Sequence, residues 1–76
     1  MPLPDKETIA KEFGVFVRIR REDMGFYQAD VAQKIGVTRG YYAHIEAGSR
    51  EIYLSLALKI CRVLKLNLRD FVKSLK

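Results

Sequence analysis

Apolar residues recur along this chain at the three- and four-residue spacings of amphipathic helices, and no useful length alternates as a β-strand does. The pattern predicts an all-α fold of five helices. They span about residues 5–24, 28–35, 39–47, 54–64 and 67–75. Thr38 and Asn67 are suited to cap the third and fifth helices, because their side-chain oxygens can accept a backbone N–H at a helix start.

Glycines follow the first three predicted helices at Gly25, Gly36 and Gly48, where a left-handed residue commonly ends a helix. Only three residues, 36–38, join the second helix to the third. Two short helices joined in this way form a helix-turn-helix, here at about residues 28–47, whose second helix projects its N-terminal residues outward. A helical hairpin without a ligand has the same spacing and stays open as an alternative.

The apolar faces predict which side chains form the core. On the third helix, Tyr42 and Ile45 point inward, opposite the outward face. On the fourth helix we expect an inward face made of Leu54, Ala57, Leu58, Cys61 and Leu64. Apolar residues that lie away from this core, Val15 and Ile19 among them, suggest a homodimer through the helices at about 54–75. Its predicted interface consists of Leu56, Val63, Leu68, Phe71, Val72 and Leu75.

Length and charge limit the possibilities. With 76 residues, the chain has enough material for one hydrophobic core, so residues 1–76 are expected to form a single domain. Lys and Arg number 14 against nine Asp and Glu, which gives a net charge of +5. Residues 51–76 carry six basic and two acidic side chains, a net of +4. This basic segment fits an anionic partner, but a solvated surface explains it equally well.

The location and chemistry are also constrained. No apolar run reaches the roughly 20 residues that span a bilayer, and the N-terminus lacks the pattern of a signal peptide. The single cysteine, Cys61, suits a reducing compartment, so a cytoplasmic location without membrane contact is expected. One histidine and one cysteine provide no metal-ligand spacing, and no nucleophile elbow or phosphate-binding loop is present. We therefore expect no enzyme activity, cofactor, metal or small-molecule ligand.

About a dozen spaced positions also match a known family. They are Phe13-Gly14, Arg21, Gly25, Gln28, Val31-Ala32, Ile35-Gly36-Val37-Thr38, Glu46 and Gly48. In this set the chain resembles the lambda-repressor-like helix-turn-helix domains of the Cro and Xre kind, over about residues 13–71. The resemblance implies a compact five-helix DNA-binding domain, usually a homodimer on a two-fold symmetric operator.

The resemblance also implies residue roles. Arg39, Gly40 and His44 match positions that face base edges, and arginine can bind guanine O6 and N7 with two hydrogen bonds. Without the resemblance, a lone exposed histidine is usually a plain surface residue. Residues expected to contact the DNA backbone or to flank the reading positions are Tyr27, Gln28, Thr38, Tyr41, Ala43 and Arg50. An ordinary surface role for Arg50 is equally open.

Three departures from the family pattern affect these expectations. Arg21 and Glu46 match an intramolecular ion pair, but Arg20 stands where the family is usually apolar. Either the stem of Arg20 is buried and its charged end reaches the solvent, or the first helix is shifted by one residue, which would let Arg20 pair with Glu46 instead. We expect the pair to form with Arg21. Tyr27 and Tyr53 replace the usual Ser or Thr caps, and a tyrosine cannot cap its own helix. Their phenols could reach phosphates instead.

These observations predict sequence-specific binding of double-stranded DNA by a bacterial or phage transcriptional regulator, a repressor or autoregulator. The alternative is a protein-interaction module, such as an antitoxin or co-regulator, in which a protein partner matters most and DNA binding is weak. Replacing Arg39 and His44 with alanine separates the two, because DNA recognition should collapse while partner binding through the C-terminal helices survives.

Overall fold

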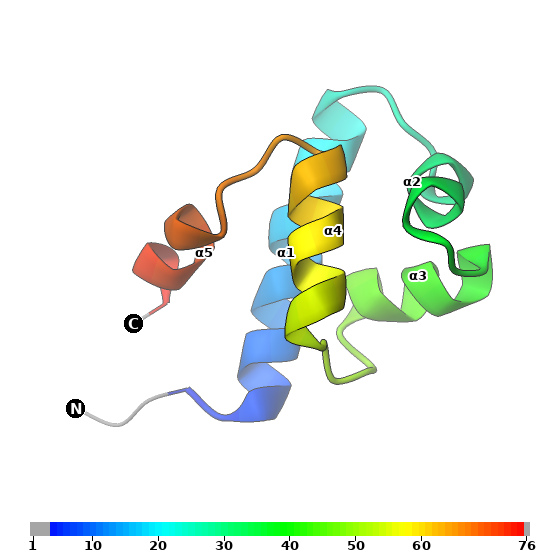
Figure 1. The fold of residues 1–76 in the computed structure, drawn as a ribbon. Helices are drawn as coiled ribbons and strands as arrows, with labels where there is room; N and C mark the ends of the chain where they lie inside the picture. Colours follow the sequence, from blue (N-terminus) through cyan, green and yellow to red (C-terminus); the bar gives the residue numbers. More distant parts are fainter. Residues whose placement is uncertain (1–3, 76) are drawn as a thin grey trace.

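The computed structural model describes residues 4–75 of the chain, and this part contains five α-helices (Figure 1). They are α1 (Lys6–Asp23), α2 (Gln28–Ile35), α3 (Arg39–Ala47), α4 (Leu54–Val63) and α5 (Leu68–Ser74). Every boundary lies within about one residue of its predicted position, and the described residues contain no strand. The predicted all-α fold class is confirmed.

Local hydrogen bonds explain where the helices begin. Thr38 Oγ1 accepts the N–H of Tyr41 at 3.1 Å, and Asn67 Oδ1 accepts the N–H of Arg69 at 2.9 Å, so both predicted caps are present. Tyr27 provides no side-chain cap for α2. Instead its backbone N–H donates to Asp30 Oδ2 at 2.7 Å, and this carboxylate lies near the positive end of the helix dipole.

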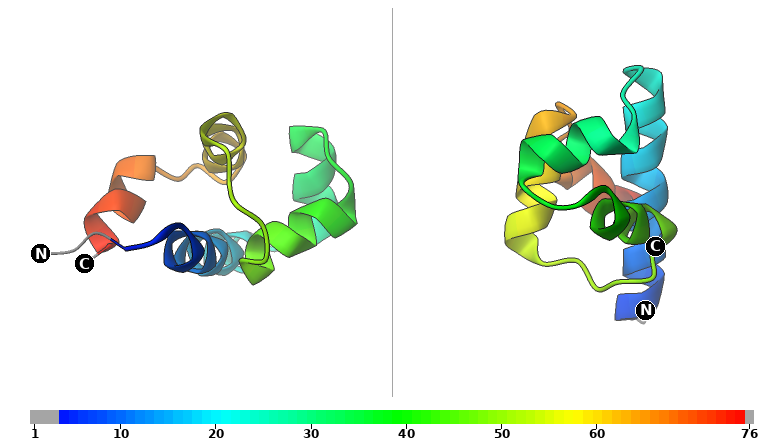
Figure 2. Two further views of the ribbon diagram at one scale, coloured as in Figure 1. Left: turned by 90° about the horizontal axis from the view of Figure 1, so that it is seen from below. Right: turned by 90° about the vertical axis from the view of Figure 1, so that its right-hand side faces the viewer.

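The helices are arranged so that α2 and α3 lie at one end of the molecule and α5 at the other (Figure 2). Between them lie α1 and α4. The molecule measures 38 × 21 × 19 Å along its principal axes, and α2 packs against both α3 and α4. Of the helices described, none is long and apolar enough to cross a membrane. The arrangement leaves the helix-turn-helix and α5 on separate surfaces.

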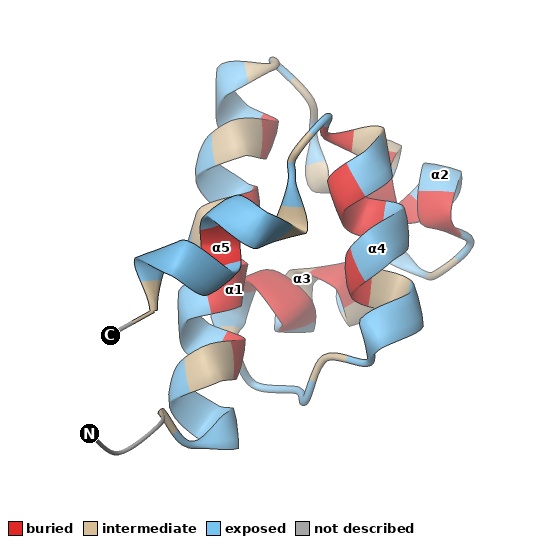
Figure 3. Cartoon of the chain, turned by 60° about the vertical axis from the view of Figure 1, so that its left-hand side comes forward, coloured by how far each residue is buried: buried red, intermediate tan, exposed pale blue. Residues whose placement is uncertain are grey.

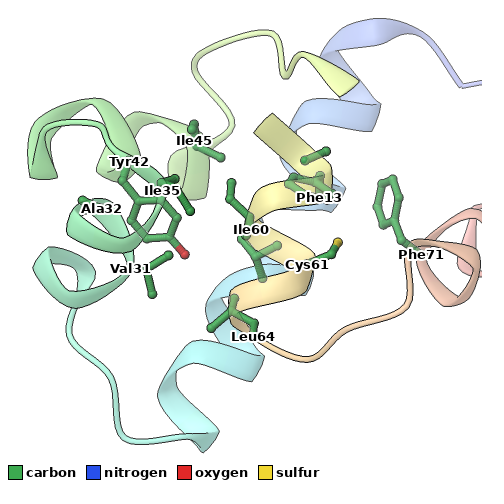
Figure 4. Packing of buried hydrophobic residues seen from close by; sticks show 12 residues of the cluster. Phe13, Val31, Ala32, Ile35, Tyr42, Ile45, Ile60, Cys61, Leu64 and Phe71 are labelled. Atoms are coloured by element: carbon green, nitrogen blue, oxygen red, sulfur yellow. The ribbon is translucent and has the colours of Figure 1, made fainter. Parts of the chain in front are cut away.

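One continuous apolar core joins all five helices (Figures 3 and 4). Its most deeply buried side chains are Phe13, Val17, Val31, Tyr42, Ile60 and Leu64. Phe71 attaches α5 to this core, because its ring meets Phe13 edge-on with centroids 5.2 Å apart. Tyr42 and Ile45 are buried on the inner face of α3, as predicted.

The prediction for the inward face of α4 was partly wrong. Leu54 and Leu58 are 67% and 50% exposed, whereas Ile60, which was not predicted, is fully buried. The buried stripe consists of Ala57, Ile60, Cys61 and Leu64. These positions follow the i, i+3, i+4, i+7 spacing of a single helix face, and residue 58 lies about 100° to the side of residue 57. An apolar run that covers more than half a helix does not by itself identify the buried side.

The predicted dimer interface also needs correction. Phe71 is only 5% exposed because it fills the space between α5 and α1, so it belongs to the core of the protomer. Leu56 and Val63 were expected to face away from the core, yet both are half-buried against it. Leu68 and Leu75 are half-buried as well, and Val72 is exposed.

Gly14 allows α1 and α3 to approach closely. A Cβ at this position would lie 2.7 Å from the carbonyl oxygen of Ile45 and nearer still to that of Glu46. Both neighbouring atoms are backbone, so they could not move aside without shifting α3. The absence of a side chain at Gly14 therefore helps to fix where α3 crosses α1.

Candidate nucleic-acid interface

The turn between α2 and α3 sets the position of α3. Gly36 adopts φ 81°, and the N–H of Val37 donates to the carbonyl of Ala32 at 3.0 Å, which closes the end of α2. Val37 is half-buried against the core, and Thr38 then starts α3. Arg39, Gly40 and His44 are all exposed on this helix, while Tyr42 and Ile45 face the core. The geometry thus leaves one long side of α3 open to a ligand.

Arg39 is hydrogen-bonded across the turn to the first residue of α2. Its Nη1 donates to Gln28 Oε1 at 3.2 Å, and Gln28 Nε2 donates to Glu46 Oε1 at 3.0 Å. Both amide atoms of Gln28 are therefore engaged, and one amide hydrogen remains free. This chain of bonds links the exposed guanidinium to a buried carboxylate, a connection that the sequence analysis missed.

The buried carboxylate belongs to the predicted ion pair. Arg21 Nε donates to Glu46 Oε2 at 2.6 Å and Arg21 Nη2 to Oε1 at 3.0 Å, so the pair is bidentate. Arg21 Nη1 also donates to the carbonyl of Phe26 at 2.8 Å. Arg21, rather than Arg20, thus ties α1 to α3, as predicted. Arg20 donates instead to the carbonyl of Leu64 at 3.0 Å.

Electrostatics keep this pair charged. Burial acts to raise the pKa of Glu46, but the hydrogen bonds from Arg21 and Gln28 outweigh it and hold that pKa below its ordinary value. The hydrogen bond to Glu46 raises the pKa of Arg21 despite its burial. Burial, and then the nearby Glu46 carboxylate, raise the pKa of the Tyr42 phenol. At neutral pH the interior of the motif therefore holds a carboxylate, a guanidinium and a neutral phenol.

The residues predicted to flank the reading positions are only partly brought together. Arg50 Cζ lies 4.8 Å from the ring centroid of Tyr41, so a cation–π contact holds Arg50 beside α3. Ala43 is half-buried next to these positions. Tyr27 stands at the start of α2 and is largely exposed. The hydroxyl of Thr38 already serves as a cap acceptor.

Ser49 is a neighbour of the site that the sequence analysis did not identify. Its Oγ lies 2.9 Å from Nδ1 of His44. Gly48 ends α3 with φ 73°, and this left-handed residue turns the chain so that Ser49 folds back over the last turn. The Gly-Ser pair immediately after the helix was the available signal.

Two short helices packed together across a three-residue turn, with the N-terminal residues of the second exposed, define the class of helix-turn-helix domains. The Helix-turn-helix family model matches residues 17–71 of the chain. The chain therefore belongs to this family and is a DNA-binding transcriptional regulator. The solved structures to which it is similar include a gene regulator, a restriction-modification controller protein and a hypothetical transcription factor.

Solved structures show the same fold. The clp gene regulator ClgR from Corynebacterium glutamicum superposes with a TM-score of 0.82 at 25% identity, over 95% of this chain and 73% of that one. The restriction-modification controller protein C.AhdI from Aeromonas hydrophila superposes with a TM-score of 0.75 at 29% identity, over 82% of this chain and 94% of that one. A hypothetical transcription factor, NHTF, from Neisseria superposes with a TM-score of 0.78 at 24% identity, over 93% of this chain and 82% of that one. This similarity shows the fold alone. No curated protein matches the sequence.

Proposed function

We propose that this regulator binds double-stranded DNA sequence-specifically through α3, as a homodimer on a two-fold symmetric operator, and that it represses transcription. The observation that carries the proposal is the open face of α3, where Arg39, Gly40 and His44 are exposed together. A helix in the major groove can place such side chains against base edges. In this proposal Arg39 reads guanine, and Gly40 lets the backbone approach the bases closely.

Contacts to the DNA backbone would come from both sides of α3. Gln28 begins α2, where free backbone N–H groups and the helix dipole favour a phosphate. Its remaining amide hydrogen can donate to the same anion. The Tyr27 phenol stands beside this helix start, and Arg50, which follows α3 in the chain, stacks its guanidinium on the ring of Tyr41 in the first turn of α3. Such contacts set the position on DNA but carry no sequence information directly.

Selection of duplexes from a randomised pool at about 150 mM salt tests the proposal. We expect enrichment of an inverted repeat whose halves are centred about 34 Å apart, one helical turn. The logarithm of affinity for the selected duplex should fall with the logarithm of salt concentration by about 0.9 per phosphate contact. Recovery of no sequence above background would refute direct readout and favour the protein-interaction alternative.

The proposed dimer uses the surface of α4 and α5 that the protomer leaves open. Leu58 and Leu68 line one shallow hollow between these helices, and Val72 lies one turn beyond Leu68. Phe71 is excluded from the interface because it is buried. In this surface α5 lies at the opposite end of the molecule from α3, and α4 lies between the two ends, so pairing and DNA contact are not expected to compete (Figure 2).

The dimer prediction can be tested by sedimentation. At tens of micromolar the protein is expected to sediment at twice its 8.8 kDa mass, and Val72→Asp should restore the protomer mass, because it places a charge among the apolar side chains that are expected to pair. Ile19→Asp on α1 is the matched control, since Ile19 and Val72 are both 59% exposed. A wild-type mass of 8.8 kDa at this concentration would contradict the dimer.

A further inference from the structure

His44 lies on the outward face of α3, and its ring contacts the segment that follows the helix. Gly48 turns the chain back at the end of the helix, and the N–H of Ser49 donates to the carbonyl of His44 at 3.1 Å. This backbone bond carries the Ser49 side chain to the histidine ring. Ser49 Oγ then lies 2.9 Å from Nδ1 and 3.2 Å from the carbonyl oxygen of the same histidine.

The hydroxyl of Ser49 has a single proton, and the number of protons determines the direction of both bonds. The carbonyl oxygen of His44 can only accept, so the hydroxyl donates its proton there. The contact to Nδ1 must then run the other way, with Nδ1–H donating to Ser49 Oγ. A neutral ring held like this carries its hydrogen on Nδ1, and Nε2 keeps a lone pair. Nε2 has no hydrogen-bond partner within residues 4–75.

We infer that Ser49 is a positioning residue that makes His44 a hydrogen-bond acceptor at Nε2, so that His44 selects a base that presents an amine on the strand it contacts. This rests on the proposed DNA-binding function of α3. In the major groove the amines are adenine N6 and cytosine N4, whereas guanine N7 and O6 and thymine O4 only accept. His44 and Arg39 thus have opposite chemical preferences, because arginine only donates.

The orientation of the ring can be measured without DNA. In nitrogen-15 NMR spectra at pH 8, where an ordinary imidazole is neutral, the wild-type His44 ring should show a protonated Nδ1 and an unprotonated Nε2. Ser49→Ala should remove this preference, and Ser49→Thr, which keeps a hydroxyl, should retain it. Both variants keep the backbone bond from residue 49, so the helix end stays intact. A wild-type ring protonated on Nε2 would overturn the inference.

The effect on base preference is measured with the selected operator. Wild type should prefer adenine or cytosine at one position of each half-site. Ser49→Ala should lower that preference about fivefold, because the His44 ring can then carry its hydrogen on Nε2 and act as a donor there. Ser49→Thr should retain the preference. Because Ser49 acts through the ring, Ser49→Ala should change nothing in a His44→Ala background. Unchanged preference in the single variant, or an equal change in both backgrounds, would overturn the inference.

These readouts separate this inference from the function on which it rests. If the operator is bound and the Arg39 position matters, but Ser49→Ala leaves every base preference unchanged, DNA recognition stands and the role of Ser49 is wrong. If wild type selects no operator at all, the proposed function fails together with base selection by His44. The NMR result then still decides whether Ser49 fixes the ring.

Discussion

Replacing Arg39 with alanine is expected to lower affinity for the selected operator by about 2–6 kcal/mol per dimer, because each protomer loses a contact worth about 1–3 kcal/mol. This corresponds to a loss of about 30-fold to more than 10,000-fold. Arg39 is exposed at the start of α3, so its removal should leave the fold intact. Titration of a labelled operator measures the affinity, and circular dichroism checks the fold.

Two matched variants make this result specific. Arg39→Lys keeps the positive charge but lacks the planar fork, so it should lose discrimination for guanine while retaining much of the salt-dependent, nonspecific affinity. Arg18→Ala removes the same charge from an exposed position on α1, outside the helix-turn-helix, and should change affinity by less than about threefold. If Arg18→Ala and Arg39→Ala weakened binding equally, Arg39 would contribute only general charge.

Replacing Glu46 with glutamine is expected to destabilise the protein by about 3–5 kcal/mol at pH 7, because it leaves the buried Arg21 guanidinium without a counter-charge. This is a large part of the 5–15 kcal/mol that a typical domain possesses. The single amide oxygen of glutamine can replace only one of the two carboxylate oxygens, so either Arg21 Nε, or Arg21 Nη2 together with Gln28 Nε2, loses its acceptor. Urea denaturation of wild type and of Glu46→Gln measures the difference in their free energies of unfolding.

The effect of Glu46 should depend on pH in a defined direction. The pKa of Glu46 is lowered in the folded protein, so its contribution is fully present above the ordinary carboxyl pKa and is lost as pH falls through the folded value. The difference between wild type and Glu46→Gln should therefore narrow as pH falls below the ordinary carboxyl value of 4.5. A difference that stays constant as pH falls below this value would contradict the assignment.

Glu22 provides the control for this prediction. Its carboxylate is 4.0 Å from Arg21 Nη2, but its side chain is 62% exposed, so water screens the interaction. Glu22→Gln should change the free energy of unfolding by less than about 1 kcal/mol at any pH. If Glu22→Gln and Glu46→Gln lowered the free energy of unfolding equally, burial of the Arg21–Glu46 pair would not explain its contribution to stability.

Local chemistry made the helices predictable from the sequence. Gly36 and Gly48 end α2 and α3 in left-handed conformations, and the Thr38 and Asn67 side chains cap their own helices, so these boundaries depend on residues close in the chain. The Arg21–Glu46 pair spans 25 positions. It could be predicted only because the resemblance to a family supplied the match.

Interactions between distant segments could not be predicted in the same way. The buried side of α4 depends on where α2 packs, so the leucines at 54 and 58 were misplaced and Ile60 was missed. Phe71 looked like an interface residue because its partner, Phe13, lies 58 positions earlier in the chain. Nothing in the spacing of Gln28 and Arg39 indicates that their side chains bond across the turn.

The sequence by itself determined that this protein is a five-helix domain with a helix-turn-helix and an outward-facing Arg39, because periodicity, caps and glycines act within a few residues of one another. The tertiary structure alone decided which apolar side chains remain exposed, and it joined Arg39 to Glu46 through Gln28. It also placed Ser49 against the His44 ring. Such features depend on how complete helices and turns pack in three dimensions, which short-range patterns do not encode.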